Sequence, residues 1–372
     1  MNIDSEVSTL LGIQYPIIQG PFGGGLSTVE LAATVSNLGG LGSYGAHILE
    51  PEAIERLCEE MRTRTARPFA INLWVSDYDA SMGDLSQQEF HQRANGYQSV
   101  YDQLSVAPPE WVPSSQALYE RQVEAVLRAR PKVFSFVFGI PSKEILSECR
   151  QRGIVTVGAA TTIEEALLLE AAGIDCLVVS GFEAGGHRPS FLKRSEDSLV
   201  GAFALIPTIR DQVNIPLIAA GGISDERGMR AALALGADAV QIGTAFLACK
   251  ESGASSTHQE QLRHNTNGDT RLSRAYTGRL ARFINNAFID SFESEAQEPL
   301  PFPAHSWLTS PIKRAATEQS NTDYMALYAG QGVPLVRNHN AEDVMAQFIA
   351  AWESIRAGTR SKKGGGNRMA IT

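Results

Sequence analysis

One histidine of the chain stands in a setting that suits proton transfer. His187 lies in the segment GFEAGGHRPSF, residues 181–191, directly after an apolar run at residues 176–181. Histidine titrates near neutral pH, so a neutral imidazole can take a proton from an acidic C–H group. The glycine pair before it would act as a flexible hinge that aims the side chain from a strand end. The alternative is an ordinary loop or packing histidine, our interpretation of the other six, including His47 in GSYGAH.

Glycine-rich turns follow three other apolar runs. They are GPFGGG at residues 20–25, AAGG at residues 219–222, and the pair Gly243 and Thr244. Glycine lets backbone N–H groups approach a phosphate closely, and a helix N-terminus adds favourable partial charge. These turns form a candidate phosphate site, although tight strand-to-helix turns also need glycine. Asn72, inside the apolar run FAINLWV, is either a satisfied core amide or a hydrogen-bonding partner of a flat heterocycle.

Eight apolar runs that alternate with helical patterns must position these residues. The runs are continuous rather than alternating, which is typical of strands covered on both faces and hence of a parallel sheet. Eight strand–helix units in sequence fit an α/β fold, a (β/α)8 TIM barrel. A doubly wound sheet is the competing architecture, but its first turn would carry a GxGxxG spacing that this chain lacks. We predict strands at residues 16–21, 41–46, 69–75, 133–139, 154–160, 176–181, 216–222 and 239–245.

The barrel gives the glycine turns a specific place. In TIM barrels the loops after strands seven and eight commonly hold a phosphate group. The segments AAGGIS and QIGTAF fall at these two positions, and each leads into a predicted helix. The candidate phosphate site and His187 would then lie at the same end of the barrel.

Two segments interrupt the strand–helix rhythm. Residues 76–115 are polar and proline-rich at their end, and residues 251–358 follow the eighth strand as helices and loops. We therefore predict a barrel over residues 1–250 that contains this insertion. A smaller, mostly helical appended region over residues 251–358 would cover the barrel mouth. Residues 359–372 have the composition of a disordered tail.

The composition indicates a cytoplasmic protein whose partners are small molecules. The formal charge of the 372 residues is −9, so nucleic acid and anionic membranes are not expected partners. No apolar stretch approaches the roughly 18 residues of a membrane span, and the N-terminus lacks the charge of a signal peptide. The four scattered cysteines show no metal or disulfide spacing, so no metal is expected. A homo-oligomer remains one option for the assembly.

Taken together, these motifs resemble the nitronate monooxygenases, formerly called 2-nitropropane dioxygenases. The matching pieces extend from about residue 10 to residue 255 and are PIIQGPFGGGLSTVELAATVSNLGGLGSYGA, PFAINLWV, EAGGHR, IPLIAAGGI and VQIGTAFLACKESGAS. A weaker echo follows in TGRLARFINN and LYAGQG. The resemblance implies an FMN-dependent TIM barrel that uses O2 to oxidise alkyl nitronates, and also nitroalkanes, to carbonyl compounds with nitrite or nitrate.

Carried over motif by motif, the resemblance assigns roles to individual residues. His187 matches the catalytic histidine of the family. The positions implied to bind FMN are Gly20, Pro21, Phe22, Gly23, Asn72, Ser180, Gly185, Gly221, Gly222, Gln241, Ile242, Gly243 and Thr244. Arg279 and Arg282 fit the family pattern without an assigned role.

Three positions depart from that pattern. Ser180 stands where Gln is common, Phe22 stands where Met is common, and Tyr44 interrupts a plainer glycine-rich segment. These departures leave the flavin prediction intact and leave the substrate open.

Two other functions are compatible with the same residues. An NAD(P)H-dependent flavin reductase of the quinone or enoyl reductase type would keep the fold, the cofactor and the EAGGH loop. A barrel that binds flavin or another phosphate ligand without turnover, as a carrier or sensor, would not need His187.

Overall fold

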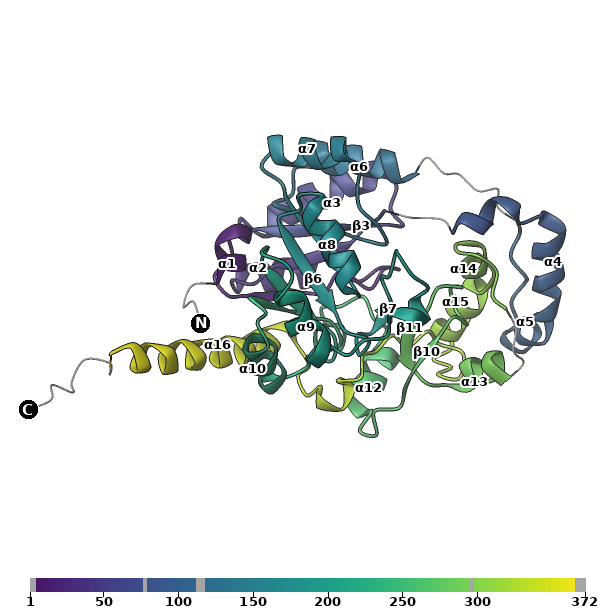
Figure 1. Ribbon diagram of the computed structural model, residues 1–372. Helices are drawn as coiled ribbons and strands as arrows, with labels where there is room; N and C mark the ends of the chain where they lie inside the picture. The colour runs from purple at the N-terminus through teal and green to yellow at the C-terminus, as the bar shows by residue number, and fades with distance from the viewer. Residues whose placement is uncertain (1–4, 76–78, 112–117, 295–297, 365–372) are drawn as a thin grey trace, which may run out of the picture.

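The computed structural model describes residues 5–75, 79–111, 118–294 and 298–364. Eight parallel strands form a ring in the order β1-β9-β8-β6-β5-β4-β3-β2, with helices around the outside (Figure 1). A parallel bridge between Ile18 and Leu41 joins β1 to β2 and closes the ring. The TIM-barrel prediction is confirmed, and each of the eight predicted strands forms. The barrel strands are β1 (Ile17–Gln19), β2 (Gly42–Gly45), β3 (Phe69–Trp74), β4 (Val133–Val137), β5 (Val155–Ala160), β6 (Cys176–Ser180), β8 (Leu217–Ala220) and β9 (Ala239–Ile242).

Helices between the strands cover the barrel. Several begin where the sequence offers a capping side chain, because Thr28, Thr162 and Asp225 each accept a hydrogen bond from a backbone N–H of the first turn. Such a cap stabilises a helix by about 1 kcal/mol. The covering helices are α2 (Val29–Asn37), α3 (Pro51–Arg64), α6 (Leu118–Ala129), α7 (Lys143–Gln151), α8 (Ile163–Ala171), α9 (Ala202–Arg210) and α10 (Glu226–Ala234). None of the described helices is long and apolar enough to cross a membrane.

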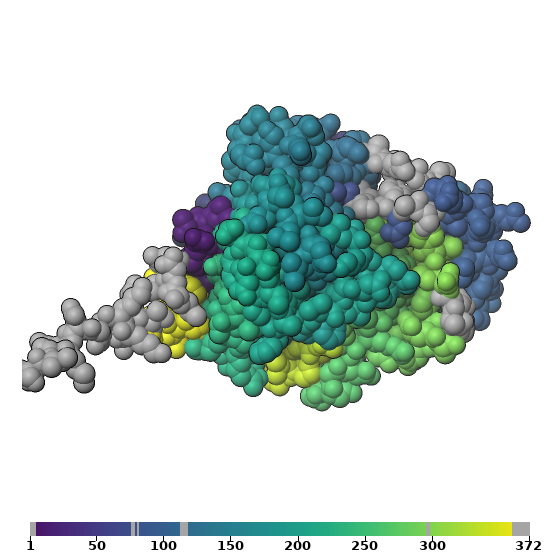
Figure 2. Space-filling model, viewed as in Figure 1, coloured from purple at the N-terminus to yellow at the C-terminus, as the bar shows by residue number. Residues whose placement is uncertain are grey.

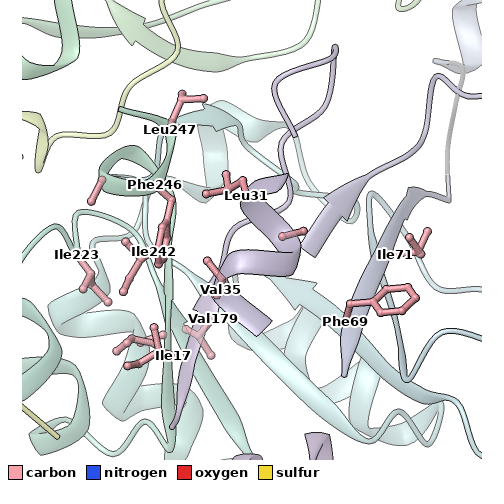
Figure 3. Close-up of a cluster of buried hydrophobic side chains, with 14 of the residues drawn as sticks. Ile17, Leu31, Val35, Phe69, Ile71, Val179, Ile223, Ile242, Phe246 and Leu247 are labelled. Carbon is pink, nitrogen blue, oxygen red and sulfur yellow. The ribbon is translucent and has the colours of Figure 1, made fainter. Parts of the chain in front are cut away.

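Alternate strand residues face two different cores. Ile17, Ile71 and Ile242 point outward and pack against the helices, where they meet Leu31 and Phe246 (Figure 3). The inward side chains fill the barrel together with those of the N-terminal helix α1 (Glu6–Leu11). This division decides which residues of each strand can contribute to a site at the barrel end.

The insertion and the segment after β9 share a third core. Phe90 and Tyr101 of the insertion pack in one cluster with Tyr276 and Ile312, and the Tyr101 hydroxyl donates to the Leu308 carbonyl at 2.8 Å. The elements of the two segments are η1 (Ala80–Asp84), α4 (Gln87–Gly96), α5 (Gln98–Leu104), α11 (Thr244–Leu247), α12 (Ser256–His264), β10 (Thr270–Ser273), β11 (Ala281–Ile284), α13 (Ala287–Ser294), α14 (Ala304–Leu308), α15 (Ser310–Glu318) and η3 (Val333–Leu335). The insertion and the part of the appended region that carries β10, β11 and α13 to α15 lie together at the right of the molecule, in blue and green (Figure 2).

This appended region is less helical and less continuous than predicted. Strands β10 and β11 form an antiparallel pair that β7 (Gly186–His187) extends, so part of the loop after β6 belongs to a second sheet. Helix α16 (Ala341–Gly364) returns to pack against α2 and α10 of the barrel. It includes residues 359–364, where the sequence predicted the tail to begin, and residues 365–372 lie outside the described part of the chain.

Candidate active site

Inward-facing polar side chains appear where several strands reach the C-terminal end of the barrel. Asn72 is buried, and its Nδ2 donates to Ser135 Oγ of the neighbouring strand at 3.0 Å. Ser180 and Gln241 occupy the same inward positions on β6 and β9, because strand side chains alternate between faces. The predicted residues therefore come to one end of the barrel. Ser135 joins them, and the sequence analysis missed it.

The loop after β1 lies beside the loop after β9. Gly20 N donates to Ile242 O at 2.8 Å. A Cβ atom placed on Gly243 would meet, among the described residues, only Phe22 Cε1 at 3.9 Å. Open space therefore borders Gly243, with Phe22 at its edge. The Ile242 side chain is fully buried in the outward core, so only the backbone of this predicted residue can face a ligand.

The turn after β8 strongly favours glycine at two positions. Gly221 and Gly222 have φ values of 112° and 69°, a region that other residues adopt with strain. A Cβ on Gly221 would lie 3.1 Å from Gly181 O, and one on Gly222 would lie 3.2 Å from Glu183 Cβ. The loops after β6 and β8 are therefore in close contact, as a shared ligand site requires.

A segment near the C-terminus completes this side of the site. Gly330 N donates to Thr244 Oγ1 at 2.9 Å, and Gln331 N donates to Glu183 O at 2.9 Å. A Cβ on Gly185 would lie 2.5 Å from Gly330 N, so Gly185 is close to this segment. These residues lie in the motif LYAGQG. The weak similarity of this motif to the family pattern was the sequence signal that pointed to the segment.

We call Gly20, Gly221, Gly222, Gly243 and Thr244 the glycine cradle. Its four glycines carry no side chain that would block a close approach. Thr244 Oγ1 accepts from Gly330 N, so the hydroxyl proton of Thr244 is available for a ligand. These features fit the phosphate of a nucleotide cofactor. Among the described residues, no group of His, Cys, Asp and Glu side chains could hold a metal ion.

His187 is held in a strand rather than on the flexible hinge that the sequence suggested. It pairs with Ala281 in the antiparallel sheet, and its Nε2 lies 2.9 Å from Thr277 Oγ1. The side chain keeps partial access to solvent, yet protein atoms surround most of it. This burial, with smaller effects from Arg279, His47 and Lys313, lowers the pKa of His187 well below 6.5. The imidazole is therefore neutral at neutral pH.

Aromatic rings surround His187. The ring of Trp74 lies 5.0 Å from the His187 ring, edge to face, and stacks on His47 at 3.9 Å. Phe138 and Tyr328 lie further out, at 6.4 and 6.0 Å. The side chain of His47 is also neutral, because burial and the charge of Arg279 lower its pKa to about 3. The sequence analysis singled out neither Trp74 nor the two outer rings.

Arg279 gains a structural role that the sequence did not reveal. Its guanidinium carbon lies 4.4 Å from the ring centre of Phe138 and 4.3 Å from that of Phe302. Its Nε donates to Asp79 Oδ1 at 3.0 Å, and Phe302 N donates to the other carboxylate oxygen at 2.9 Å. This cluster joins the insertion to the appended region directly beside His187.

The remaining residues that the sequence analysis singled out have distinct positions. Arg282 donates to Phe182 O at 2.9 Å and so supports the loop after β6. Gly23 packs closely on the ring of His47, so a side chain there would collide with it. Tyr44 packs into the outward core beside the helices, so this departure from the family pattern lies away from the barrel end.

Comparisons with known proteins agree with this architecture. The family model for nitronate monooxygenase matches residues 4–350. A probable nitronate monooxygenase of Bacillus subtilis is 37% identical over 88% of this chain and 93% of its own length. One from Staphylococcus haemolyticus is 35% identical over 93% of this chain and 96% of its own length.

Solved structures give the same result. Nitroalkane oxidase from Streptomyces ansochromogenes superposes with a TM-score of 0.86 at 34% identity, covering 95% of this chain and 99% of its own. FabK from Thermotoga maritima superposes with a TM-score of 0.74 at 25% identity, covering 97% of this chain and 100% of its own. The chain belongs to the nitronate monooxygenase family of flavin-dependent oxidoreductases.

Proposed function

We propose that this enzyme binds FMN at the barrel end and uses O2 to oxidise alkyl nitronates, and also nitroalkanes, to carbonyl compounds with nitrite or nitrate. The observation that carries the proposal is the position of His187, a neutral histidine at the same barrel end as the glycine cradle. Membership of the nitronate monooxygenase family and the similarity to a nitroalkane oxidase support the substrate class.

The chain would hold FMN mainly through its backbone. The glycine cradle would bind the phosphate, and the inward polar side chains of Asn72, Ser180 and Gln241 would bind the ring system. When bound, FMN would supply an electron acceptor for the substrate, with O2 as the final oxidant. The protein contributes position and electrostatics.

His187 would move the proton. A nitroalkane has an acidic C–H next to the nitro group, and the lone pair of a neutral imidazole can accept that proton. A nitronate arrives without it and needs only to be oriented. The charge of Arg279 favours an anion nearby, since Coulomb interactions are stronger where protein replaces water. The rings of Trp74 and Phe138 offer an apolar surface for an alkyl chain.

A second candidate, an NAD(P)H-dependent flavin reductase, keeps the fold and the cofactor. The similarity to FabK motivates it, because FabK superposes on 97% of this chain with a TM-score of 0.74 at 25% identity.

The test combines cofactor identification with two assays on one preparation. The purified protein should be yellow and release FMN on denaturation, and it should consume O2 when a nitronate is added without NADH. Rapid NADH oxidation that ignores the nitronate would favour the reductase. Release of FAD alone, or a colourless protein that does not bind added FMN, would refute the cofactor assignment.

A further inference from the structure

A threonine outside the barrel makes the hydrogen bond that orients His187. Thr277 lies in the turn between β10 and β11 and is buried. Its Oγ1 is 2.9 Å from His187 Nε2. The question is which of the two atoms carries the proton, because that choice decides which ring nitrogen of His187 is basic.

The other contacts of Thr277 Oγ1 answer this question. Arg279 N lies 3.3 Å away and can only donate, whereas Arg279 O lies 3.1 Å away and can only accept. A hydroxyl has one proton and two lone pairs. If the proton goes to Arg279 O and one lone pair accepts from Arg279 N, the second lone pair accepts from His187. This is the one assignment in which every contact is a hydrogen bond, and it puts the proton of His187 on Nε2.

The opposite ring nitrogen is then the basic one. Among the described residues, no hydrogen bond reaches His187 Nδ1, yet this nitrogen is not one of the fully buried polar atoms that lack a partner, so it keeps some access to solvent. Nδ1 therefore presents its lone pair on the side of the ring away from Thr277.

The turn that carries Thr277 is itself anchored. The carbonyl of Tyr276 accepts from Thr309 Oγ1 at 2.6 Å and from Lys313 Nζ at 3.2 Å. Gly278 has a φ of 81° and donates to Arg274 O at 2.9 Å. A hydroxyl on such a turn is preorganised, so it selects one tautomer of His187 rather than adapting to either.

We propose that Thr277 is a positioning residue that fixes the tautomer of His187 and makes Nδ1 the atom that accepts the proton of a nitroalkane. The catalytic part rests on the proposed function, and the tautomer part does not. Without the hydroxyl, Nε2–H would face an apolar group, and the tautomer with the proton on Nδ1, which can reach solvent, would become favoured. We expect the rate with neutral nitroalkanes to fall by about tenfold, the scale of one hydrogen bond.

The test is long-range 1H–15N NMR on the holoenzyme labelled with 15N-histidine, with the cofactor oxidised. The chain has seven histidines, and His187→Asn identifies the signals of His187. We expect a protonated Nε2 and an unprotonated Nδ1 in the wild type and in Thr277→Ser, which keeps the hydroxyl. Thr277→Val, of nearly the same shape, should show a protonated Nδ1. A protonated Nδ1 in the wild type would overturn the proposal, even if the valine variant does not fold.

Kinetics separate this inference from the proposed function. Turnover of nitroethane should fall in Thr277→Val and recover in Thr277→Ser, whereas turnover of ethyl nitronate should change little. An unchanged tautomer in Thr277→Val would refute the positioning role even if nitroethane is oxidised. If the NMR spectra show the expected tautomers but the enzyme oxidises no nitro compound, the proposed function is refuted and the tautomer assignment stands.

Discussion

The glycine cradle and the region around His187 differ in composition. The glycine cradle is made of backbone from loops that directly follow barrel strands, and its essential property is the absence of side chains. The region around His187 is made of side chains that come from the end of β3, from the segment after β4, from β7 and from the appended region. The first should determine whether a cofactor binds, and the second should determine what the bound cofactor can do.

The largest expected effect comes from His187→Asn, which keeps similar size but cannot act as the base. Turnover of neutral nitroalkanes should fall by at least about a hundredfold, the low end for loss of a general base. Nitronates should suffer less, and FMN should stay bound because the glycine cradle is unchanged. The measurement is steady-state O2 consumption with both forms of one substrate.

His264→Asn is the matched control, because His264 is exposed on α12, away from this site. Equal losses on the two substrate forms would mean that His187 orients the substrate rather than removing a proton. Full activity on both forms would show that His187 has no part in the chemistry.

A substitution in the glycine cradle should instead weaken FMN binding. Gly222 and Gly153 have nearly the same backbone angle, with φ values of 69° and 70°, but Gly153 precedes β5 at the other end of the barrel. Alanine at either position adds about 1–2 kcal/mol of backbone strain. At Gly222 the new Cβ would also lie 3.2 Å from Glu183 Cβ, whereas Gly153 has open space, so Gly222→Ala should lose somewhat more stability than Gly153→Ala. Only Gly222→Ala should weaken FMN binding. A strain of this size that opposes the bound conformation corresponds to a loss of affinity of about tenfold or more.

Titration of the apoprotein with FMN, followed by flavin fluorescence, measures this difference. Gly243→Val extends the test, since its side chain would enter the open space beside Phe22. If both cradle variants fold and bind FMN like the wild type, the phosphate site lies elsewhere.

Acid should lower the free energy of unfolding through buried histidines, which include His258 and His305 besides His47 and His187. Burial lowers the pKa of His258 to about 4 and that of His305 to about 3, and His305 Nε2 donates to Ala275 O next to the Thr277 turn. A lowered pKa means that the unfolded chain binds these protons first. The free energy of unfolding should therefore reach its full value above about pH 6.5. As the pH falls further, this free energy should decrease by about 1.4 kcal/mol per pH unit for each histidine.

Urea unfolding at a series of pH values measures this slope. In His305→Gln the slope of the unfolding free energy against pH, between about pH 6 and 4, should be smaller by the contribution of one proton, about 1.4 kcal/mol per pH unit. An unchanged slope would mean that His305 is protonated in the folded protein, contrary to its burial.

The smallest effect is expected at Ser180, the position where relatives commonly carry glutamine. The side chain of Ser180 faces the barrel end and is nearly buried, so a longer amide could reach the flavin ring. Ser180→Gln should strengthen FMN binding by about 0.5–1.5 kcal/mol, the net value of one hydrogen bond. Loss of FMN from this variant would show that the pocket is built around the smaller side chain.

The difference between the two sides also explains what the sequence could predict. Barrel strands carry their own signal, because a strand covered on both faces is a continuous apolar run. The glycine cradle is equally local, since the turns directly follow those runs. The strands were therefore predicted correctly, and the structure brings the predicted glycine turns to one end of the barrel, where Gly20 N donates to Ile242 O.

The surroundings of His187 carry no such local signal. Strand β7 has two residues, too few for any periodicity, and it exists only because β11 pairs with it. Thr277 is 90 residues away in sequence from the histidine that it contacts. Trp74 lay inside a predicted strand, but its contact with His187 depends on how that distant sheet docks. Only the motif TGRLAR, which contains both Thr277 and Arg279, hinted at this region.

The return of α16 to the barrel has a consequence for synthesis on the ribosome. This helix packs between α10 and α2, and Ala341 N donates to Glu251 Oε2 at 3.1 Å, so α16 covers the seam where β9 meets β1. A nascent chain that has emerged only to about residue 255 has all eight barrel strands but leaves that seam bare. The outer face of this seam can be covered only after α16 has been made, so we expect a ribosome that stalls within residues 256–340 to present that bare apolar face to chaperones and proteases.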